Sequence, residues 1–348
     1  MTRCGSLGRS FVCAVVLSAV ALLGRTPDAW DTRLQDGINA IAQGRYVDAV
    51  EILTPALEEA NAFQGDSRRT EVILTLATAY QYQSQLQKAE ALFLEAKRLA
   101  EPMGAGGRRF LGYALAGLGQ LRLNQGRWQE AEDLLRPAIE VCRETLGDTD
   151  PCTTTATRNL GDLYLMEGQT HKAEAFFAQS LEVLRRSPSQ PEALVSTLRG
   201  LGRVYLIQGR FTSAEPLFQE AVELSKRMGE SHPIYADSLV DLSELYRLEC
   251  KGARAEPLLK KAVRIYELAG DSHIVDALYN LGLIAVDEAK FTTARDYLER
   301  SLKMSEQLFG QAHITTTRAQ AALAEAYLGE RNYSGAESLI QKGIVNGP

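Results

Sequence analysis

Residues 208–218 read QGRFTSAEPLF, and variants of this stretch recur along the whole chain. Seven further segments align with it: QGRYVDAVEIL, QSQLQKAEALF, QGRWQEAEDLL, EGQTHKAEAFF, ECKGARAEPLL, EAKFTTARDYL and ERNYSGAESLI. They share an aligned alanine: Ala49, Ala89, Ala131, Ala173, Ala214, Ala255, Ala294 and Ala336, spaced 39 to 42 residues apart. Self-similarity at such a period indicates a tandem array of one supersecondary unit.

Each segment is predicted to join two helices through a tight turn. Five residues before the alanine lies a position that we call the turn residue: Gly44, Ser84, Gly126, Gly168, Gly209, Cys250, Ala289 and Arg331. Glycine there suits the left-handed turn that ends one helix before another begins. Seven residues before it every copy has Gly, Ala or Ser, which predicts close helix contact. Four residues after the alanine a large apolar residue recurs, and we call this the core position.

The second helix of two units begins with a sequence typical of a helix start. Thr212 with Glu215 and Ser334 with Glu337 both fit the Ser/Thr-x-x-Glu capping box. Each unit is therefore predicted to be a helical hairpin.

These residues carry a family resemblance. The small residue, the aromatic residue four before the turn (Tyr80, Tyr164, Tyr205, Tyr246 and Tyr327), the turn and Ala-Glu-x-Leu/Phe resemble the tetratricopeptide repeat. The period and phrases such as GESHPIYADSLVDLSELY and AEPLLKKAVRIYE resemble the longer repeat of kinesin light chains. Eight units run from about Asp31 to Val345. The first departs by having Asp36 where the others have leucine, as an N-terminal cap would.

The resemblance implies an all-α fold, with residues 30–348 forming one right-handed superhelical solenoid of about eight hairpins. It also implies a non-enzymatic protein whose concave groove, lined by first helices, binds a peptide or protein segment. Inward positions lie ten and six residues before each turn residue. By this resemblance, the inward positions of this chain are Leu34 and Ile38, Leu74 and Thr78, Ala116 and Gln120, Arg158 and Asp162, Arg199 and Arg203, Val240 and Glu244, Tyr279 and Leu283, and Ala321 and Glu325.

The middle of this groove is the candidate peptide-binding site, with Arg158, Asp162, Arg199, Arg203, Glu244 and Tyr279 as its residues. Relatives that clamp a terminal carboxylate have Lys, Arg or Asn at these positions, and guanidinium groups bind carboxylates in bidentate geometry. The alternative is that Asp162 and Glu244 neutralise the arginines from adjacent helices, which would leave no ligand site. The asparagines of a full carboxylate clamp are absent from these positions.

Two cysteines flank the junction between the third and fourth units. Cys142 lies 16 residues after one turn residue, and Cys152 lies 16 residues before the next. This symmetry allows a disulfide between antiparallel helices, which typically contributes about 2–4 kcal/mol. The alternative is that the helical faces point the two thiols apart. The mature chain would keep Cys142, Cys152 and Cys250, an odd number, which in an oxidising compartment leaves one thiol free or paired with another chain.

The N-terminus has the layout of a signal peptide. Arg3 and Arg9 precede the uncharged run from Phe11 to Leu23, which is shorter than the ~17–25 residues of a spanning helix. We expect residues 1–29 to be removed, an exported protein that is periplasmic or secreted, and no stable membrane insertion of the mature chain. Tethering by an uncleaved N-terminal segment is the alternative. Loss of three arginines and Asp28 would lower the net charge from −6 to −8.

Charge and motifs argue against several other functions. An acidic chain with a pI near 5.5 is not expected to bind nucleic acid. His232, His273 and His313 recur once per unit before first helices, which predicts turn residues rather than metal ligands. No motif for a cofactor is found, so none is expected. An interaction scaffold is therefore the leading hypothesis. A ligand-responsive regulator and a hydrolase that uses the groove are the alternatives, and the oligomeric state is not predicted.

Overall fold

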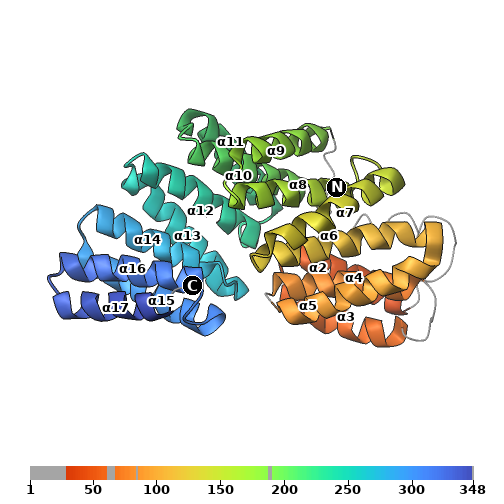
Figure 1. The fold of residues 1–348 in the computed structure, drawn as a ribbon, viewed down its shortest axis with the longest axis horizontal. Helices are drawn as coiled ribbons and strands as arrows, with labels where there is room; N and C mark the ends of the chain where they lie inside the picture. Colours follow the sequence, from red (N-terminus) through yellow and green to blue (C-terminus); the bar gives the residue numbers. More distant parts are fainter. Residues whose placement is uncertain (1–28, 61–66, 84, 187–189, 347–348) are drawn as a thin grey trace, which may run out of the picture. The chain divides into compact units, whose positions relative to one another are not determined.

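The computed structural model describes residues 29–60, 67–83, 85–186 and 190–346. The described residues form α-helices and one 3-10 helix, with no β-strand among them, so the predicted all-α repeat fold is confirmed (Figure 1). The predicted signal peptide falls, apart from Ala29, outside these residues. Searched over the same described part of the chain, no helix combines the length and apolar character that crossing a membrane requires.

The chain divides into two compact units, residues 1–228 and 229–348, and each is described separately. The expectation of one continuous solenoid over residues 30–348 stays a prediction. Unit 1 contains α2 (Ala29–Ala42), α3 (Tyr46–Ala60), α4 (Ser67–Tyr82), α5 (Leu86–Ala100), η2 (Glu101–Gly107), α6 (Arg108–Asn124), α7 (Trp128–Leu146), α8 (Pro151–Met166), α9 (Thr170–Arg185), α10 (Pro191–Ile207) and α11 (Phe211–Met228). Unit 2 contains α12 (Pro233–Leu248), α13 (Gly252–Ala269), α14 (Ile274–Asp287), α15 (Phe291–Phe309), α16 (Ile314–Gly329) and α17 (Tyr333–Asn346).

Within each unit the helices pair as hairpins, and successive hairpins stack. Each even-numbered helix packs against the odd-numbered helix that follows it, and the second helix of one hairpin packs against the first helix of the next. The first helices α2, α4, α6, α8 and α10 also contact one another in succession, as do α12, α14 and α16. Stacking is needed because a single amphipathic hairpin cannot bury its apolar side alone.

The seven turn residues that the structure describes are all left-handed, as the sequence predicts. Four turn residues are glycines with φ between 70° and 73°. The three turn residues of unit 2, Cys250, Ala289 and Arg331, adopt φ between 56° and 62° although they carry a Cβ. The eighth, Ser84, lies outside the described residues.

Replacing Ala289 with glycine is expected to stabilise unit 2 by about 0.5–1 kcal/mol. The left-handed conformation costs a residue with a Cβ about 1–2 kcal/mol, and the greater freedom of glycine in the unfolded chain offsets part of the gain. Urea denaturation followed by circular dichroism measures the change. Ala321→Gly, at an exposed position inside α16, is the control and is expected to lose about 1 kcal/mol. If both variants changed the free energy of unfolding in the same direction, the argument would be contradicted.

Small residues are required where the two helices of a hairpin meet. A Cβ on Gly202 would lie 2.5 Å from Phe218, and one on Gly119 would lie 2.7 Å from Leu135. Both apolar partners occupy the core position and are buried. The predicted close helix contact is thus an approach of the first helix to the core side chain of the second.

The glutamate of the Ala-Glu pair joins consecutive hairpins. Glu132 of α7 accepts a hydrogen bond from the hydroxyl of Tyr164 in α8 at 2.7 Å. That hydrogen bond lowers the pKa of Glu132, while burial and the same contact raise the pKa of Tyr164 to about 12. In the third unit, which has Arg122 at the tyrosine position, the guanidinium instead pairs with Glu90 of α5 at 2.6 Å. The polar residues of the repeat thus hold neighbouring hairpins in register.

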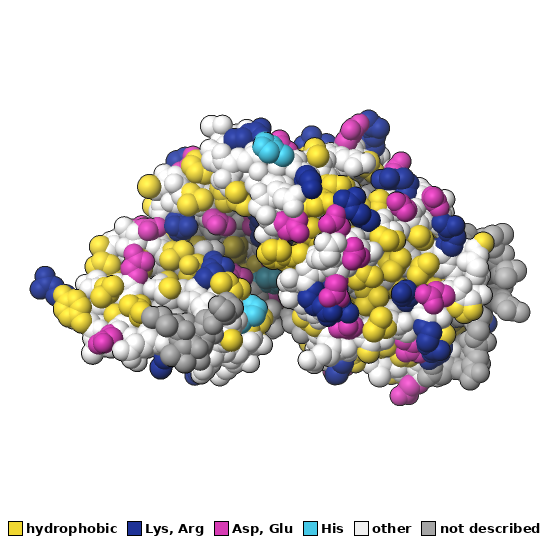
Figure 2. Space-filling model, in the orientation of Figure 1, with side chains coloured by type: hydrophobic (Ala, Val, Ile, Leu, Met, Phe, Trp, Pro, Cys, Tyr) yellow, Lys and Arg dark blue, Asp and Glu magenta, His cyan; other side chains and the backbone are white. Residues whose placement is uncertain are grey.

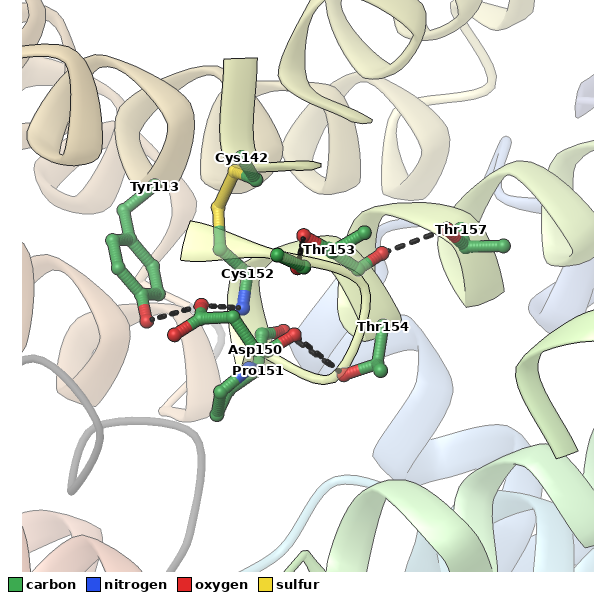
Figure 3. The surroundings of a disulfide bond; sticks show 9 residues. Tyr113, Cys142, Asp150, Pro151, Cys152, Thr153, Thr154 and Thr157 are labelled. Carbon is green, nitrogen blue, oxygen red and sulfur yellow. Dashed lines mark hydrogen bonds between the residues drawn. A yellow bond between two sulfur atoms is a disulfide. The ribbon is translucent and has the colours of Figure 1, made fainter. Parts of the chain in front are cut away.

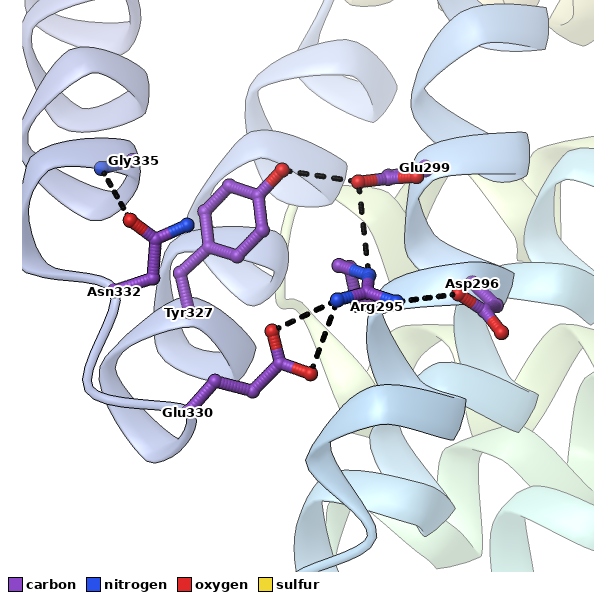
Figure 4. A network of polar contacts seen from close by, with 7 residues as sticks. All are labelled: Arg295, Asp296, Glu299, Tyr327, Glu330, Asn332 and Gly335. Atoms are coloured by element: carbon purple, nitrogen blue, oxygen red, sulfur yellow. Dashed lines mark hydrogen bonds and ion pairs between the residues drawn. The ribbon is translucent and has the colours of Figure 1, made fainter.

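A related network joins α15 to the final hairpin, and the start of α17 corrects a prediction. Arg295 of α15 pairs with Glu330 at 3.1 Å, and the hydroxyl of Tyr327 donates to Glu299 at 2.9 Å (Figure 4). The helix α17 begins at Tyr333, and Asn332 accepts a hydrogen bond from the backbone N–H of Gly335 at 3.1 Å. Asn332 therefore caps α17, and the prediction of Ser334 as the cap was wrong. The prediction of Thr212 as a cap was also wrong, because α11 already begins at Phe211.

Candidate protein-binding surface

Arg158 and Asp162 lie one turn apart on α8, a first helix of unit 1. Arg158 Nη1 contacts Asp162 Oδ2 at 2.6 Å, and both side chains are between one fifth and one quarter exposed. Asp162 therefore neutralises Arg158 from the same helix, whereas the sequence analysis considered neutralisation from an adjacent helix.

Arg199 and Arg203 take the same two positions on α10, which contacts α8. Arg199 is half-buried and Arg203 is exposed. Helices α8 and α10 together carry three arginines, Asp162 and Glu192, which is an excess of one formal positive charge in a chain whose net charge is −6. The structure thus places the predicted arginines on neighbouring helices.

One turn beyond these charges, each helix presents an exposed apolar side chain. Met166 ends α8 and is 55% exposed, and Ile207 ends α10 and is 62% exposed. Isolated exposed apolar residues are normal. These two hold the same position of the repeat on contacting helices, and we call them the apolar row. We define the α8–α10 surface by its six residues: Arg158, Asp162, Met166, Arg199, Arg203 and Ile207.

The sequence analysis missed Met166 and Ile207, although a signal for them was present. Both lie two residues before a turn residue, where Tyr82 and Leu248 are exposed as well. Applying the register of the repeat to this position would have found them.

The inward positions of the first three repeats do not form an exposed groove. Leu34, Ile38, Leu74, Thr78 and Ala116 are all at most 8% exposed. The prediction that these side chains line an accessible concave surface was therefore wrong for five of the six positions, and Gln120 alone is half-buried. They belong to the core because they are apolar or small, or, as in Thr78, bond back to their own helix at 2.9 Å.

Glu244 and Tyr279, the remaining predicted site residues, belong to unit 2. Glu244 lies half-buried on α12, and Tyr279 lies half-buried on α14 with the guanidinium of Arg318 4.7 Å from its ring centroid. The α8–α10 surface is defined without them because it lies wholly in unit 1.

A disulfide lies at the junction that leads into α8. The structure joins Cys142 of α7 to Cys152 of α8, with their Cα atoms 5.8 Å apart and both residues fully buried (Figure 3). Asp150 caps α8 by accepting a hydrogen bond from the N–H of Cys152 at 2.8 Å. Burial raises the pKa of Asp150, which also accepts a hydrogen bond from the hydroxyl of Tyr113 in α6 at 3.0 Å.

The same junction is bound to the following hairpin. Gln190, just before α10, donates to the carbonyl of Thr149 and accepts from the hydroxyl of Thr154 at 2.9 Å. The α7–α8 junction therefore contacts α6, α8 and the start of α10 together. It fixes the spacing of the helices that present the arginines.

The three recurring histidines occupy helix starts. The Nδ1 atoms of His232 and His313 each accept a hydrogen bond at 3.2 Å from the N–H two residues later. His273 instead contacts Asp271 at 2.7 Å, and this hydrogen bond and the nearby carboxylates raise its pKa to about 9. Over the described residues, no three His, Cys, Asp or Glu side chains are grouped so as to hold a metal ion.

Comparison with known proteins agrees with this architecture. The sequence profile of the tetratricopeptide repeat matches residues 111–186, 194–267 and 274–315, more than half of the chain. No curated protein sequence matches the chain significantly.

Solved structures resemble the chain at low sequence identity. One is a Rap protein complexed with Competence and Sporulation Factor (TM-score 0.62, 13% identity, 91% of this chain and 97% of that chain). Another is a STAND signal transduction ATPase with a tetratricopeptide repeat sensor from Pyrococcus horikoshii (0.60, 16%, 90% and 46%). A third contains kinesin light chain repeats from Podosopora anserina (0.47, 19%, 55% and 92%). At these identities the likeness concerns the fold.

Proposed function

Because this chain belongs to the tetratricopeptide repeat family, whose members are in general non-enzymatic scaffolds for protein interaction, we propose that it binds a protein segment across the α8–α10 surface. The observation that carries the proposal is the pairing of an arginine-rich row with an apolar row on two contacting helices of unit 1. Rap complexed with its factor is a structure of the same fold holding a partner, which supports the role but not the residues.

The chemistry of the surface indicates the chemistry of its partner. Arginine forks bind carboxylates, and Met166 and Ile207 offer apolar contact area one turn away. Four residues of helix span about 6 Å, which an extended chain covers in about two residues. The matching segment is extended and has an acidic group separated by about two residues from an apolar side chain. The anchors should decide affinity, while the charges steer association.

Reversing the charge of Arg199 and Arg203 together is expected to abolish partner capture. A hydrogen bond to a charged group contributes about 1.5–3 kcal/mol, so each arginine that binds a carboxylate accounts for about 10- to 100-fold in affinity. The test is a crosslinking pull-down with the purified chain from the native envelope fraction, comparing R199E/R203E with the unmodified chain. Capture should also weaken as salt is added, because exposed charges are screened.

Arg186→Glu is the matched control, since Arg186 directly follows α9, is 74% exposed and lies outside the surface. It should capture the same partner as the unmodified chain. Equal capture by R199E/R203E, with helicity intact by circular dichroism, would reject the α8–α10 surface as the binding site.

We further propose that the protein works outside the cytoplasm, with residues 1–29 as its export signal. The charged and then apolar N-terminal sequence supports this, and so does the disulfide, since such bonds persist in oxidising compartments. Cell fractionation with N-terminal sequencing of the recovered protein tests it. Recovery of the intact N-terminus in the cytoplasmic fraction would contradict export.

A further inference from the structure

The turn between α16 and α17 contains a short motif that the repeat does not explain. Residues 332–334 read Asn-Tyr-Ser, which fits the acceptor motif for N-linked glycans, Asn-x-Ser/Thr with any residue except proline in the middle. No other asparagine of the chain begins this motif. At the equivalent position, directly after the turn residue, every other repeat has arginine, lysine or glutamine. The motif is therefore a property of the last repeat alone.

All three residues of the motif lie at the surface. Asn332, Tyr333 and Ser334 are exposed, and Arg331 before them is exposed as well. Arg331 has the left-handed φ of 62°, and α17 begins at Tyr333. The asparagine therefore lies in the turn itself rather than inside a helix. An exposed turn is the setting in which an acceptor asparagine is accessible to a transferase.

The hydrogen bonds of Asn332 leave its amide nitrogen available. Its Oδ1 accepts from the backbone N–H of Gly335 at 3.1 Å (Figure 4) and from the hydroxyl of Ser334 at 3.3 Å. Within the described part of the chain, no hydrogen bond uses Nδ2, the atom to which an N-linked glycan is attached. The two side chains that define the motif are thus in contact, and the cap of α17 uses one atom of the carboxamide while the glycan would use the other.

Capping alone does not account for an asparagine at this position. The second helices α5, α7, α9, α13 and α15 all begin without a hydrogen bond from a side-chain cap. The repeat therefore forms its second helix without a capping residue. The presence of Asn332 together with Ser334 is a departure that calls for another role.

We propose that Asn332 carries an N-linked glycan. This inference rests on the export proposed above, because acceptor motifs of this kind are used in secreted proteins. The donor is a lipid-linked oligosaccharide diphosphate. A bond forms between Nδ2 and the anomeric carbon of the first sugar, and the bond from that carbon to the diphosphate oxygen breaks. The diphosphate leaves, one Nδ2 proton is released, and neither partner is oxidised or reduced.

The glycan would lie where the last hairpin exposes apolar surface. Tyr333, next to the acceptor, is 66% exposed, and Leu328 of α16 is 49% exposed. Hydrophobic side chains at the surface of this part of unit 2 are visible at the lower left of Figure 2. Because a glycan is bulky and solubilising, one on Asn332 reduces the contact of these side chains with other molecules.

Mass spectrometry of the full chain, recovered from its native envelope or secreted fraction, tests the modification. The proteolytic peptide that contains residues 332–334 should carry the added mass of several sugars, and fragmentation should locate them on Asn332. N-terminal sequencing of the same sample shows whether residues 1–29 were removed. The two measurements separate glycosylation from export.

Four variants test the assignment to this motif. Asn332→Asp keeps an oxygen that can cap α17 but has no amide nitrogen, so it should fold and lose the glycan completely. Ser334→Ala should lose the glycan although Asn332 is present, whereas Ser334→Thr should keep it, because the motif accepts either hydroxyl. Asn124→Asp, at an exposed asparagine outside the motif, is the control and should stay glycosylated.

Three results would overturn the proposal. A chain that is exported and processed but has an unmodified Asn332 would exclude the glycan while supporting export. A chain found in the cytoplasm with its N-terminus intact and Asn332 unmodified would exclude both. A glycan that persists in Asn332→Asp would lie on another residue, contrary to the assignment made here.

Discussion

Replacing Phe177 with alanine is expected to lower the free energy of unfolding by about 3–5 kcal/mol, the largest effect expected of a single substitution in this chain. Phe177 is fully buried in α9 and packs between two glycines, Gly161 in α8 and Gly200 in α10. Loss of the ring leaves a cavity that neither glycine can fill with a side chain. It also removes the contact that holds two consecutive hairpins together.

Urea denaturation followed by circular dichroism measures the effect. Leu94→Ala is the matched control: Leu94 is a large apolar residue of the second helix α5, but it is 48% exposed, so its loss should stay within about 0.5 kcal/mol. A loss below about 1 kcal/mol for Phe177→Ala would mean that the hairpins relax into the cavity, contrary to the close packing described here.

Removing the disulfide with C142A/C152A is expected to lower the free energy of unfolding by about 2–4 kcal/mol. The bond closes a loop between residues 10 positions apart and, being buried beside Gly112 of α6, also contributes packing. Because the junction binds α6, α8 and the start of α10, its loosening should also weaken binding at the α8–α10 surface.

The measurement compares unmodified chain and C142A/C152A, each with and without a dithiol reductant. Reductant should destabilise the unmodified chain and leave the double variant unchanged. Cys250→Ser is the control, since Cys250 is exposed and outside the disulfide, and it should behave like the unmodified chain. Equal stability of the unmodified chain in both conditions would contradict a stabilising bond.

The fold could be predicted because its determinants are local and repeated. A turn residue, a small residue and a core residue at fixed spacing each specify one contact, and the same specification is repeated in eight copies. Even the turns with Cys250, Ala289 and Arg331 followed the alignment, although their side chains disfavour the left-handed conformation. At these three turns the backbone conformation follows the position in the repeat rather than the conformational preference of the individual residue.

The candidate site was predicted only in part. Register placed the arginines on neighbouring first helices, but it did not reveal that Asp162 pairs within its own helix or that Met166 and Ile207 continue the surface. The cysteines left two alternatives open, because a difference in helical phase of one residue turns a side chain by about 100°. Those outcomes depend on how far the helices rotate and approach, which spacing alone does not give.

By itself, the sequence determined the hairpins, their turns and the residues that must be small, because these follow from contacts within about 40 residues of chain. Only the tertiary structure decided which of the equivalent side chains are covered by a neighbouring helix and which are exposed to solvent. Leu34 and Arg158 share one position of the repeat, and so do Phe177 and Ile340, yet one of each pair is buried and the other is partly exposed. The physical reason is that the burial of a side chain depends on the neighbouring helix as much as on the residue itself.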